Sequence, residues 1–446
     1  LAAGAIFIFV YSNYYGGGEL TADAGKFLKE GAILANVFYE APLDYFKFLL
    51  NLETSEMFLL YLHATTHWAG DPNAVLNDSK NLVKIHSLFH LVSFGYYPIH
   101  LIFSCFVSLF GVYHLTKAFS HFTAFNEKWL FLLLLLAPSA LFWTSGLLKE
   151  PFLFLGIGLF CRGLINETKW VKKSCYLAFG LFFLLSFKPY SLVCILLAWF
   201  VYVLFVNIQR KIIAFGILIG ISSIFLTYLL SVEQSRFTTF ISHKQSDFIG
   251  ISKGGTYIRN DSCFFIFDDA QLKLLEIREG DYYLKEKTPV EYIFPYTKNS
   301  PKKTIAYPNS EPWEFGYKYQ KCGSFIPVDY IDNSSTQLVK NIPQAIKNAT
   351  FRPYFNDPGS DFKYLAFLEI WLLFGTLLFT FIQRRKLKQK EFAMIMALAT
   401  FSIALLLLIG WTTPVLGAIV RYRFSAFLAI SLIGIILLKN KKNVTS

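Results

Sequence analysis

Long apolar runs, separated by short polar or basic stretches, recur along the whole chain. Runs of about 18 or more apolar residues predict helices that cross a membrane, and we predict about ten such spans. The predicted spans are residues 1–14, 97–115, 129–143, 151–166, 175–187, 190–206, 212–230, 364–382, 392–410 and 424–438. The pattern therefore predicts a polytopic α-helical membrane protein.

The composition agrees with this interpretation. Hydrophobic residues make up 54% of the 446 residues and charged residues only 16%, whereas soluble domains carry about 25% charged residues. The net charge of +12 does not require nucleic acid, because most of the surplus lies in short loops between apolar runs. We expect no nucleic-acid partner and extensive contact with membrane lipids.

The first apolar run is shorter than the about 20 residues that a span needs. We therefore expect further residues before Leu1. A cleaved signal peptide is the alternative, although no cleavage-type small-residue site is visible in the sequence.

The basic residues of the short loops predict the orientation of the spans. One set of loops holds 16 Lys and Arg, and the opposite set holds four. The larger set comprises Lys117, Lys128, Arg162, Lys169, Lys172, Lys173, Arg210, Lys211, Arg384, Arg385, Lys386, Lys388, Lys390, Lys439, Lys441 and Lys442. These loops are predicted to be cytoplasmic, so the two long polar segments of the chain are predicted to lie outside.

The first long segment, residues 15–96, links the first two predicted spans. Residues 32–62 within it carry apolar side chains at helical spacing together with scattered charges. This pattern predicts helices that lie along the outer membrane interface rather than across it.

The second long segment, residues 231–361, is polar, rich in Tyr, Pro and Gly, and balanced in charge. It is long enough for a small domain, and short runs such as CFFIFD at 263–268 predict a mixed or mostly β extracytoplasmic module. Residues 337–349 predict a helix leading back to the membrane. We expect a membrane bundle over 1–230, this module over 231–361, which is a candidate surface for protein partners, and the last spans over 362–446.

The six cysteines fall into two groups. Four lie in or beside predicted spans and are expected to act as small apolar residues: Cys105, Cys161, Cys175 and Cys194. Cys263 and Cys322 lie in the second long segment and are a disulfide candidate in an oxidising compartment. Two unlinked thiols are the alternative, because sequence does not supply the Cα separation that a disulfide requires.

Seven charged residues lie at the predicted outward ends of spans. They are Lys149 and Glu150 in FWTSGLLKEP, Lys188 in SFKPY, Arg352 in FRPYF, Glu369 inside the eighth span, and Arg421 and Arg423 in WTTPVLGAIVRYR. Ionisable groups at membrane depth are costly and often functional, although a single Lys or Arg can simply extend to the headgroups. As a set, the five basic residues predict a site for a lipid phosphate, which Arg binds through its planar fork and Lys as a point charge.

Asp23 is the candidate catalytic residue. It lies in YYGGGELTADAGKFLKEG (14–31), after a triple glycine that allows a sharp turn and after Glu19, a candidate supporting acid. A carboxylate beside a desolvated site can take a proton from a hydroxyl. The alternative is a structural role, because Thr21 or Asp23 would also suit the N-terminus of a helix starting at Ala24.

The chain resembles the GT-C superfamily of polytopic, polyprenyl-phosphate-dependent glycosyltransferases. The resemblance is carried by the pattern D-A-x-x-aromatic at Asp23, Ala24 and Phe27, by the long first outer segment with interface helices, and by PSALFWTSGLLKE at 138–150. The closing segment 417–423, which ends in RYR, is similar to that of bacterial envelope-polysaccharide membrane proteins.

The resemblance implies a multi-pass protein of the bacterial inner (cytoplasmic) membrane with its long loops and its site facing the periplasm. It also implies an undecaprenyl-phosphate-linked sugar as donor, inversion at the anomeric carbon, and Asp23 as the base. Many family members place two adjacent acids in the first outer loop, whereas Asp23 has Glu19 and Glu30 nearby but no acidic neighbour. We therefore expect no required cofactor, and a divalent metal is the weaker alternative.

The histidine pairs His63/His67 and His86/His90 have the i, i+4 spacing that places two ligands on one helix face. Two ligands are too few for a closed metal site, so we assign no metal residues. Two further functions stay open. One is an O-antigen-type polysaccharide polymerase, and the other is a non-catalytic membrane subunit of an envelope or secretion complex.

Overall fold

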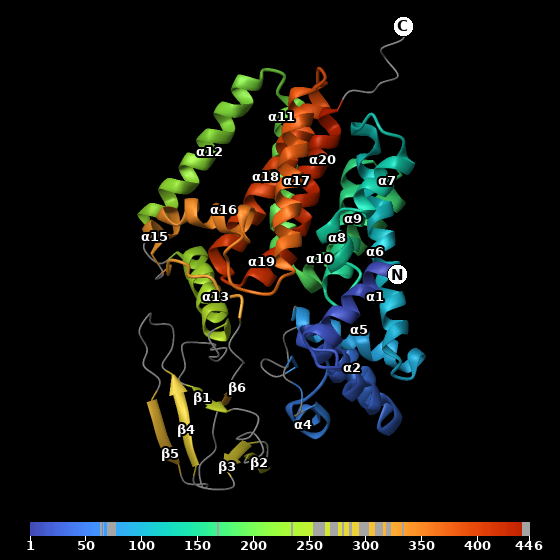
Figure 1. Ribbon diagram of the computed structural model, residues 1–446, viewed down its shortest axis with the longest axis vertical. Coiled ribbons are helices and arrows are strands. Elements are labelled where there is room, and N and C mark those ends of the chain that lie inside the picture. Colours follow the sequence, from blue (N-terminus) through green and yellow to red (C-terminus); the bar gives the residue numbers. More distant parts are fainter. Residues whose placement is uncertain are drawn as a thin grey trace. The chain divides into compact units, whose positions relative to one another are not determined.

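The computed structural model describes most of the chain (Figure 1). The described residues are 1–62, 65, 67–68, 77–166, 169–232, 235–252, 264–267, 275–278, 281–284, 288–293, 303–307, 315–317, 323–331 and 334–438. They form two compact units, unit 1 (residues 1–203, 376–401 and 427–446) and unit 2 (residues 204–375 and 402–426).

Unit 1 is built from helices. They are α1 (Ala2–Phe9), η1 (Val10–Tyr14), α2 (Ala22–Glu40), α3 (Pro42–Leu50), α4 (Ser55–Met57), η2 (Phe58–Leu62), α5 (Asp78–Ser93), α6 (Tyr97–Phe119), η3 (Ser120–Phe122), α7 (Glu127–Leu135), α8 (Pro138–Trp143), α9 (Glu150–Ile165) and α10 (Trp170–Phe187). Unit 2 contributes α12 (Lys211–Ser231), α13 (Arg236–Ser252), α15 (Ser335–Lys340), α16 (Ile342–Phe351) and α19 (Leu416–Tyr422). Four helices run through both units: α11 (Pro189–Asn207), α17 (Lys363–Ile382), α18 (Gln389–Thr412) and α20 (Phe424–Leu437).

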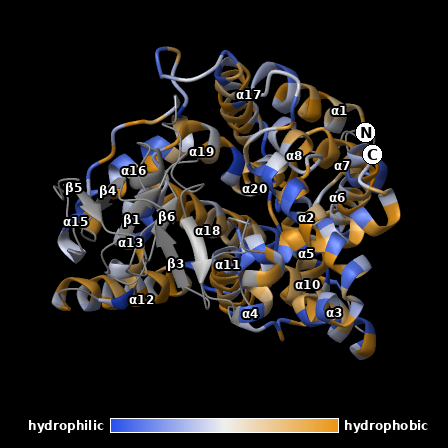
Figure 2. Ribbon diagram, turned by 90° about the horizontal axis from the view of Figure 1, so that it is seen from below, coloured by the Kyte–Doolittle hydropathy of each residue, from blue (hydrophilic) through white to orange (hydrophobic). Residues whose placement is uncertain are grey.

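Six helices among the described residues are long and apolar enough to cross a membrane, or seven if the bent pair α19–α20 forms one span. They match the predicted spans at 97–115, 175–187, 190–206, 212–230, 364–382 and 392–410, and the bent pair includes the one at 424–438. Figure 2 shows that most of α17 is hydrophobic. The chain is therefore a multi-pass helical membrane protein, but the prediction of ten spans was wrong.

Three predicted spans fail the length requirement for different reasons. Residues 1–14 form only a short apolar helix, Ala2–Tyr14, and 151–166 corresponds to the 16-residue helix α9. The predicted span 129–143 is split into α7 and α8. The break falls before Pro138, which cannot continue the hydrogen-bond ladder of the preceding helix and restricts the residue before it.

Close backbone contacts hold α9 between α6 and α10. A Cβ added to Gly158 would lie 2.6 Å from the carbonyl oxygen of Gly111 on α6, and one added to Gly180 on α10 would lie 2.6 Å from the nitrogen of Phe160. Small residues at these crossings let the helix backbones approach, which is the usual way in which membrane helices pack.

The segment between α1 and α6 folds onto the ends of these helices. α2 packs along α5, and Gly31 lies so close to α5 that a Cβ there would be 2.7 Å from the Cβ of His86. A buried apolar cluster joins α2, α3 and α5 to Phe152 of α9 and Phe187 of α10. The helices predicted for this segment are thus present, and their position at a membrane interface stays a prediction.

In unit 2, α13, α15, α16 and α18 share a smaller apolar cluster that includes Ile241, Leu338, Ala345 and Trp411. The helix predicted at 337–349 is present as α15 and α16, with a break at Asn341. Backbone hydrogen bonds between 324–326 and 414–416 tie the chain before α15 to the start of α19.

Short strands occur within the segment predicted as an extracytoplasmic module. They are β1 (Phe264–Phe267), β2 (Leu275–Arg278), β3 (Asp281–Leu284), β4 (Thr288–Ile293), β5 (Lys303–Tyr307) and β6 (Phe315–Tyr317). Four pair in the order β5-β4-β1-β6, with β1 and β6 parallel, and β2 pairs with β3. That residues 231–361 form an independent module outside the membrane stays a prediction.

The glycine contacts generate a stability prediction. Gly158→Ala should lower the unfolding free energy by about 1–3 kcal/mol, because overpacking forces backbone shifts, whereas Gly216→Ala on α12, where nothing lies within 4 Å of the added Cβ, should be neutral or slightly stabilising. Thermal unfolding of both variants in the same detergent measures the difference. Equal melting temperatures would show that α6 and α9 do not pack as described.

Candidate functional site

Asp23 lies in the first turn of α2, directly after a tight turn. Gly17 and Gly18 have φ values of +58° and +109°, in the left-handed region that glycine adopts without strain. The turn returns to η1 through hydrogen bonds from the Gly18 N–H to the Ser12 carbonyl, 2.9 Å, and from the Thr21 N–H to the Tyr11 carbonyl, 3.1 Å.

Thr21 occupies the N-cap position of α2 without a side-chain capping bond, because its hydroxyl donates instead to the Tyr11 carbonyl at 2.7 Å. Asp23 is partly exposed two residues later, where a negative charge interacts favourably with the helix dipole. Glu19 is exposed and pairs with Lys29 at 3.2 Å on the surface. Of the two predicted acids in this stretch, Asp23 is thus the one placed at the packed face of α2.

Asp23 shares that face with Phe27 and Glu30, since the spacings i, i+4 and i+7 return to the same side of a helix. Phe27 is buried, and two cationic or titratable groups contact its ring. The Lys149 ammonium lies 5.3 Å from the ring centre, and the His67 ring stacks at 4.3 Å. Lys149 and His67 therefore both contact Phe27, which lies one helical turn after Asp23 on α2.

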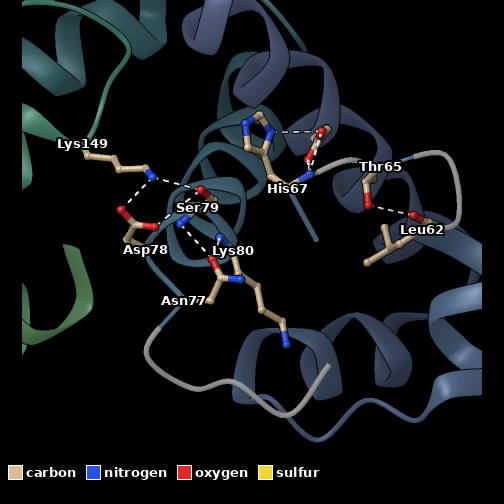
Figure 3. Close-up of polar contacts among 9 residues, drawn as sticks. Leu62, Thr65, His67, Asn77, Asp78, Ser79, Lys80 and Lys149 are labelled. Atoms are coloured by element: carbon tan, nitrogen blue, oxygen red, sulfur yellow. Dashed lines mark hydrogen bonds and ion pairs between the residues drawn. The ribbon is translucent and has the colours of Figure 1, made fainter. Parts of the chain in front are cut away.

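Lys149 lies in the turn before α9 and reaches the start of α5 (Figure 3). Its ammonium is 2.8 Å from an Asp78 carboxylate oxygen and donates to the Ser79 hydroxyl at 2.9 Å. Asn77 fixes this end of α5 by accepting from the backbone N–H groups of Ser79 and Lys80, both at 3.1 Å. An ammonium has three donors, so these two contacts leave Lys149 the capacity for a further acceptor.

Lys188 and Glu150 form a buried ion pair instead. The ammonium donates to a Glu150 carboxylate oxygen at 3.0 Å, and the two side chains are 6% and 0% exposed. The pair joins the end of α10 to the start of α9. Lys188 was predicted to bind a donor phosphate, but this geometry gives its ammonium a structural partner and very little access.

Glu30 and His67 form a carboxylate–imidazole pair. Glu30 accepts the His67 backbone N–H at 3.2 Å with each oxygen, and His67 Nδ1 lies 3.0 Å from one of them. In the sequence, His67 stands only in a weak metal motif with His63, which lies outside the described residues. The pairing could not be inferred from the sequence because 37 positions separate the two residues.

A second buried charge group lies beside this region and was not predicted. Lys80 and Glu53 form an ion pair in which both side chains are fully buried. Lys80 and Lys84 both lie over the ring of Trp68, at 4.8 and 5.5 Å from its centre. Burial, together with the charge of Lys80, lowers the pKa of Lys84 to about 8.

The histidine pair on α5 has structural partners. His86 Nδ1 lies 3.1 Å from His100 Nδ1 on α6, and His90 Nε2 lies 2.9 Å from the Leu28 carbonyl oxygen on α2. Burial lowers the pKa of His86 to about 3, with smaller contributions from His100 and His90. Within the described ranges, no group of three or more His, Cys, Asp or Glu side chains is arranged to hold a metal ion.

Unit 2 brings two predicted phosphate ligands together. Arg423 is fully buried and donates from Nη1 to the carbonyl oxygens of Ala349, at 3.1 Å, and of Arg352. The Arg352 side chain donates to Asn348 Oδ1 at 3.0 Å and pairs with Asp357. The two arginines, 71 positions apart, thus meet where α16 ends and α20 begins.

Arg421 and Glu369 belong to the same unit. Arg421 is partly exposed, and its guanidinium lies 5.0 Å from the Tyr422 ring centre. Glu369, on α17, contributes a favourable electrostatic interaction to the Arg423 guanidinium. The disulfide candidates Cys263 and Cys322 lie outside the described residues, whereas Cys105, Cys161, Cys175 and Cys194 are unlinked.

The predicted site residues are therefore distributed over both units. Unit 1 holds Asp23, Glu19, Lys149, Glu150 and Lys188, and unit 2 holds Arg352, Glu369, Arg421 and Arg423. Comparisons with protein-family models, with curated proteins and with solved structures found no match.

The Lys188–Glu150 pair generates the second prediction. Lys188→Met leaves the Glu150 carboxylate buried without its ammonium, which should lower the unfolding free energy by about 3–5 kcal/mol, and the double variant Lys188→Met/Glu150→Leu should recover most of the loss. Chemical unfolding in detergent measures both variants. Lys117→Met, which breaks the exposed pair with Glu127, is the control and should have little effect. A Lys188→Met protein as stable as the wild type would contradict a structural role for this pair.

Proposed function

We propose that the protein is a membrane glycosyltransferase that moves a sugar from a polyprenyl-phosphate carrier to a hydroxyl of a cell-envelope acceptor. In this proposal the Asp23 carboxylate accepts the proton of the acceptor hydroxyl. Lys149 contacts the phosphate of the donor. The protein belongs to the bacterial inner membrane and works on its periplasmic side.

The observation that supports the proposal is a lysine and an imidazole at one buried ring of α2, the helix that carries Asp23 in its first turn. Asp23 lies one helical turn from Phe27, and both Lys149 and His67 contact that ring. Transfer of a sugar from a phosphate leaving group needs a base for the incoming hydroxyl and positive charge for the departing phosphate. We assign the first role to Asp23 and the second to Lys149.

The ion pairs divide the predicted cations into two kinds. Lys188 and Arg423 are buried against Glu150 and against backbone carbonyls, so we assign them to holding helix ends in place. Lys149 is partly exposed and is retained in the proposal as the phosphate ligand, whereas Arg352 and Arg421 belong to unit 2 and have no role in this site of unit 1. Glu150 and Glu369 interact with the structural cations Lys188 and Arg423, and Glu19 pairs with Lys29 beside the turn before Asp23.

The third prediction concerns Asp23. Asp23→Asn keeps the size of the side chain but removes its basicity, so transfer should fall by about 100-fold or more while donor binding is retained. The assay follows radiolabelled sugar from a panel of undecaprenyl-phosphate-linked donors into envelope material, with purified protein in lipid vesicles. Asp44→Asn is the matched control, because Asp44 pairs with Lys47 on the exposed side of α3 and its loss should leave the rate unchanged.

Full activity of a folded Asp23→Asn protein would remove Asp23 from this role. Transfer of one sugar per acceptor is expected, and long products from a single-sugar donor would favour the polymerase alternative. If wild-type protein transfers no sugar from any donor of the panel, the enzyme proposal fails and the non-catalytic membrane subunit becomes the better account.

A further inference from the structure

Two lysines on one face of α5 hold the end of α3 and the chain that follows it. Lys80 and Lys84 are four residues apart, so their side chains leave the same side of the helix. The Lys84 ammonium donates to the carbonyl oxygen of Leu49, at 3.1 Å, and to Asn51 Oδ1, at 2.6 Å. Lys80 forms an ion pair with Glu53. The chain directly after α3 is thus fastened to α5 at three points by two ammonium groups.

The indole ring of Trp68 forms one wall of this group. The ammonium groups of Lys80 and Lys84 lie over the ring, 4.8 and 5.5 Å from its centre, and Trp68 is buried. Trp68 also packs edge-on against Phe48 of α3, with the ring centres 5.6 Å apart. Both rings belong to the apolar cluster that contains Phe27. Opening of the fastened segment would therefore uncover this cluster.

The buried charges of the group do not balance. The side chains of Lys80 and Glu53 are both 0% exposed, and Lys84 is 7% exposed. When Lys84 is protonated, two positive charges share the single Glu53 carboxylate among the described residues that act on Lys84. A buried charge is costly unless an opposite charge is well placed, and Glu53 already pairs with Lys80. The charge of Lys84 is therefore the surplus one.

The hydrogen bonds of Lys84 do not require that charge. An ammonium has three N–H donors, and the neutral amine keeps two. The Leu49 carbonyl and the Asn51 amide oxygen provide an acceptor for each of them. Loss of one proton thus removes the surplus charge and preserves both hydrogen bonds to the end of α3.

We propose that Lys80, Lys84 and Glu53 form a pH-sensitive latch that closes segment 49–62 onto α5. The latch is tightest when Lys84 is neutral, and it loosens when Lys84 binds a proton. This regulatory device does not depend on the proposed function, because it concerns how the segment is held and not the transfer of a sugar.

The direction of the pH effect follows from the burial of Lys84. Burial and then the charge of Lys80 lower the pKa of Lys84 to about 8, against an upward contribution from Glu53. When the segment opens, Lys84 returns to water and to its ordinary pKa of 10.5. Between these two values opening takes up a proton, so it becomes rarer as the pH rises from 8 towards 10.5. Below pH 8 the full cost of the buried charge is present.

The other charged groups on the elements around α5 have partners of their own. His86 and His90 on α5 face His100 of α6 and the Leu28 carbonyl of α2. The remaining pairs are Asp44 with Lys47, Glu30 with His67, Asp78 with Lys149, and Glu150 with Lys188. Lys80 and Glu53 are therefore the charged neighbours that act on Lys84.

The fourth prediction tests the latch by hydrogen–deuterium exchange of the intact protein in detergent at pH 7 and pH 9.5. Protection of peptides from residues 45–62, relative to their intrinsic exchange at each pH, should rise about tenfold or more at pH 9.5. Peptides from α16 in unit 2 are the internal reference and correct for general effects of alkaline solution.

Three variants assign the effect to Lys84. Lys84→Gln keeps two N–H donors without a charge, so protection should be the same at both pH values. Lys84→Arg keeps its charge throughout this range, so protection should stay low at both. Lys47→Gln removes a half-exposed lysine of α3, and this matched control should show the same rise as the wild type.

Two results would overturn the proposal. One is a wild-type segment whose protection does not change between pH 7 and pH 9.5. The other is a wild-type rise that persists in Lys84→Gln or in Lys84→Arg, because the titrating group would then be a different one. The wild type and Lys84→Arg decide the question even if Lys84→Gln does not fold. Sugar transfer is tested separately by the Asp23 variant.

Discussion

A charge that leaves water in this protein has to be met by an opposite charge or by backbone dipoles. Removing an ionised group from water costs several kcal/mol, and the cost is recovered only when partners are well placed. Lys188 with Glu150, Lys80 with Glu53, and Arg423 with two carbonyl oxygens satisfy this requirement. Each contact joins segments far apart along the chain, so the charges fix where the ends of helices meet.

The same requirement separates structural charges from charges that can act on a ligand. Lys188 is buried against a buried carboxylate and has little capacity left for another partner. Lys149 is also a lysine in a turn at a helix end. Its partner Asp78, however, is 41% exposed, and the Lys149 ammonium keeps one N–H donor for a further acceptor. His67 differs again, since one edge of its ring is engaged by Glu30 and the other is not covered by that contact. The candidate site lies where a charged group keeps hydrogen-bonding capacity beyond its partners within the protein.

Sequence reasoning succeeded where a signal is local. Apolar runs identified each helix of the described residues that is long enough to span, and the glycine run before Asp23 identified the turn that positions α2. The predicted number of spans was too high for two reasons. An apolar run does not reveal a break such as the one before Pro138, and it does not show where the helix ends, so a helix too short to cross a membrane was counted as a span. The charges at predicted span ends include residues that form ion pairs, such as Lys149, Lys188 and Arg352, but the sequence did not show which partner each would have.

The pairings were beyond prediction because they depend on packing between distant segments. Glu30 and His67 were both noticed, one as a nearby acid and the other in a spacing typical of metal ligands, yet nothing local indicates that they meet. Lys80, Glu53 and Trp68 show the same limit. A single sequence shows which charged residues are present, whereas the partner of each charge depends on how the chain folds.

The most direct test of this account is an experimental structure of the protein with undecaprenyl phosphate bound. The account predicts phosphate density against Lys149, with Asp23 facing the same space. Phosphate density elsewhere, with Lys149 still confined to Asp78 and Ser79 and with no space open beside Asp23, would contradict it.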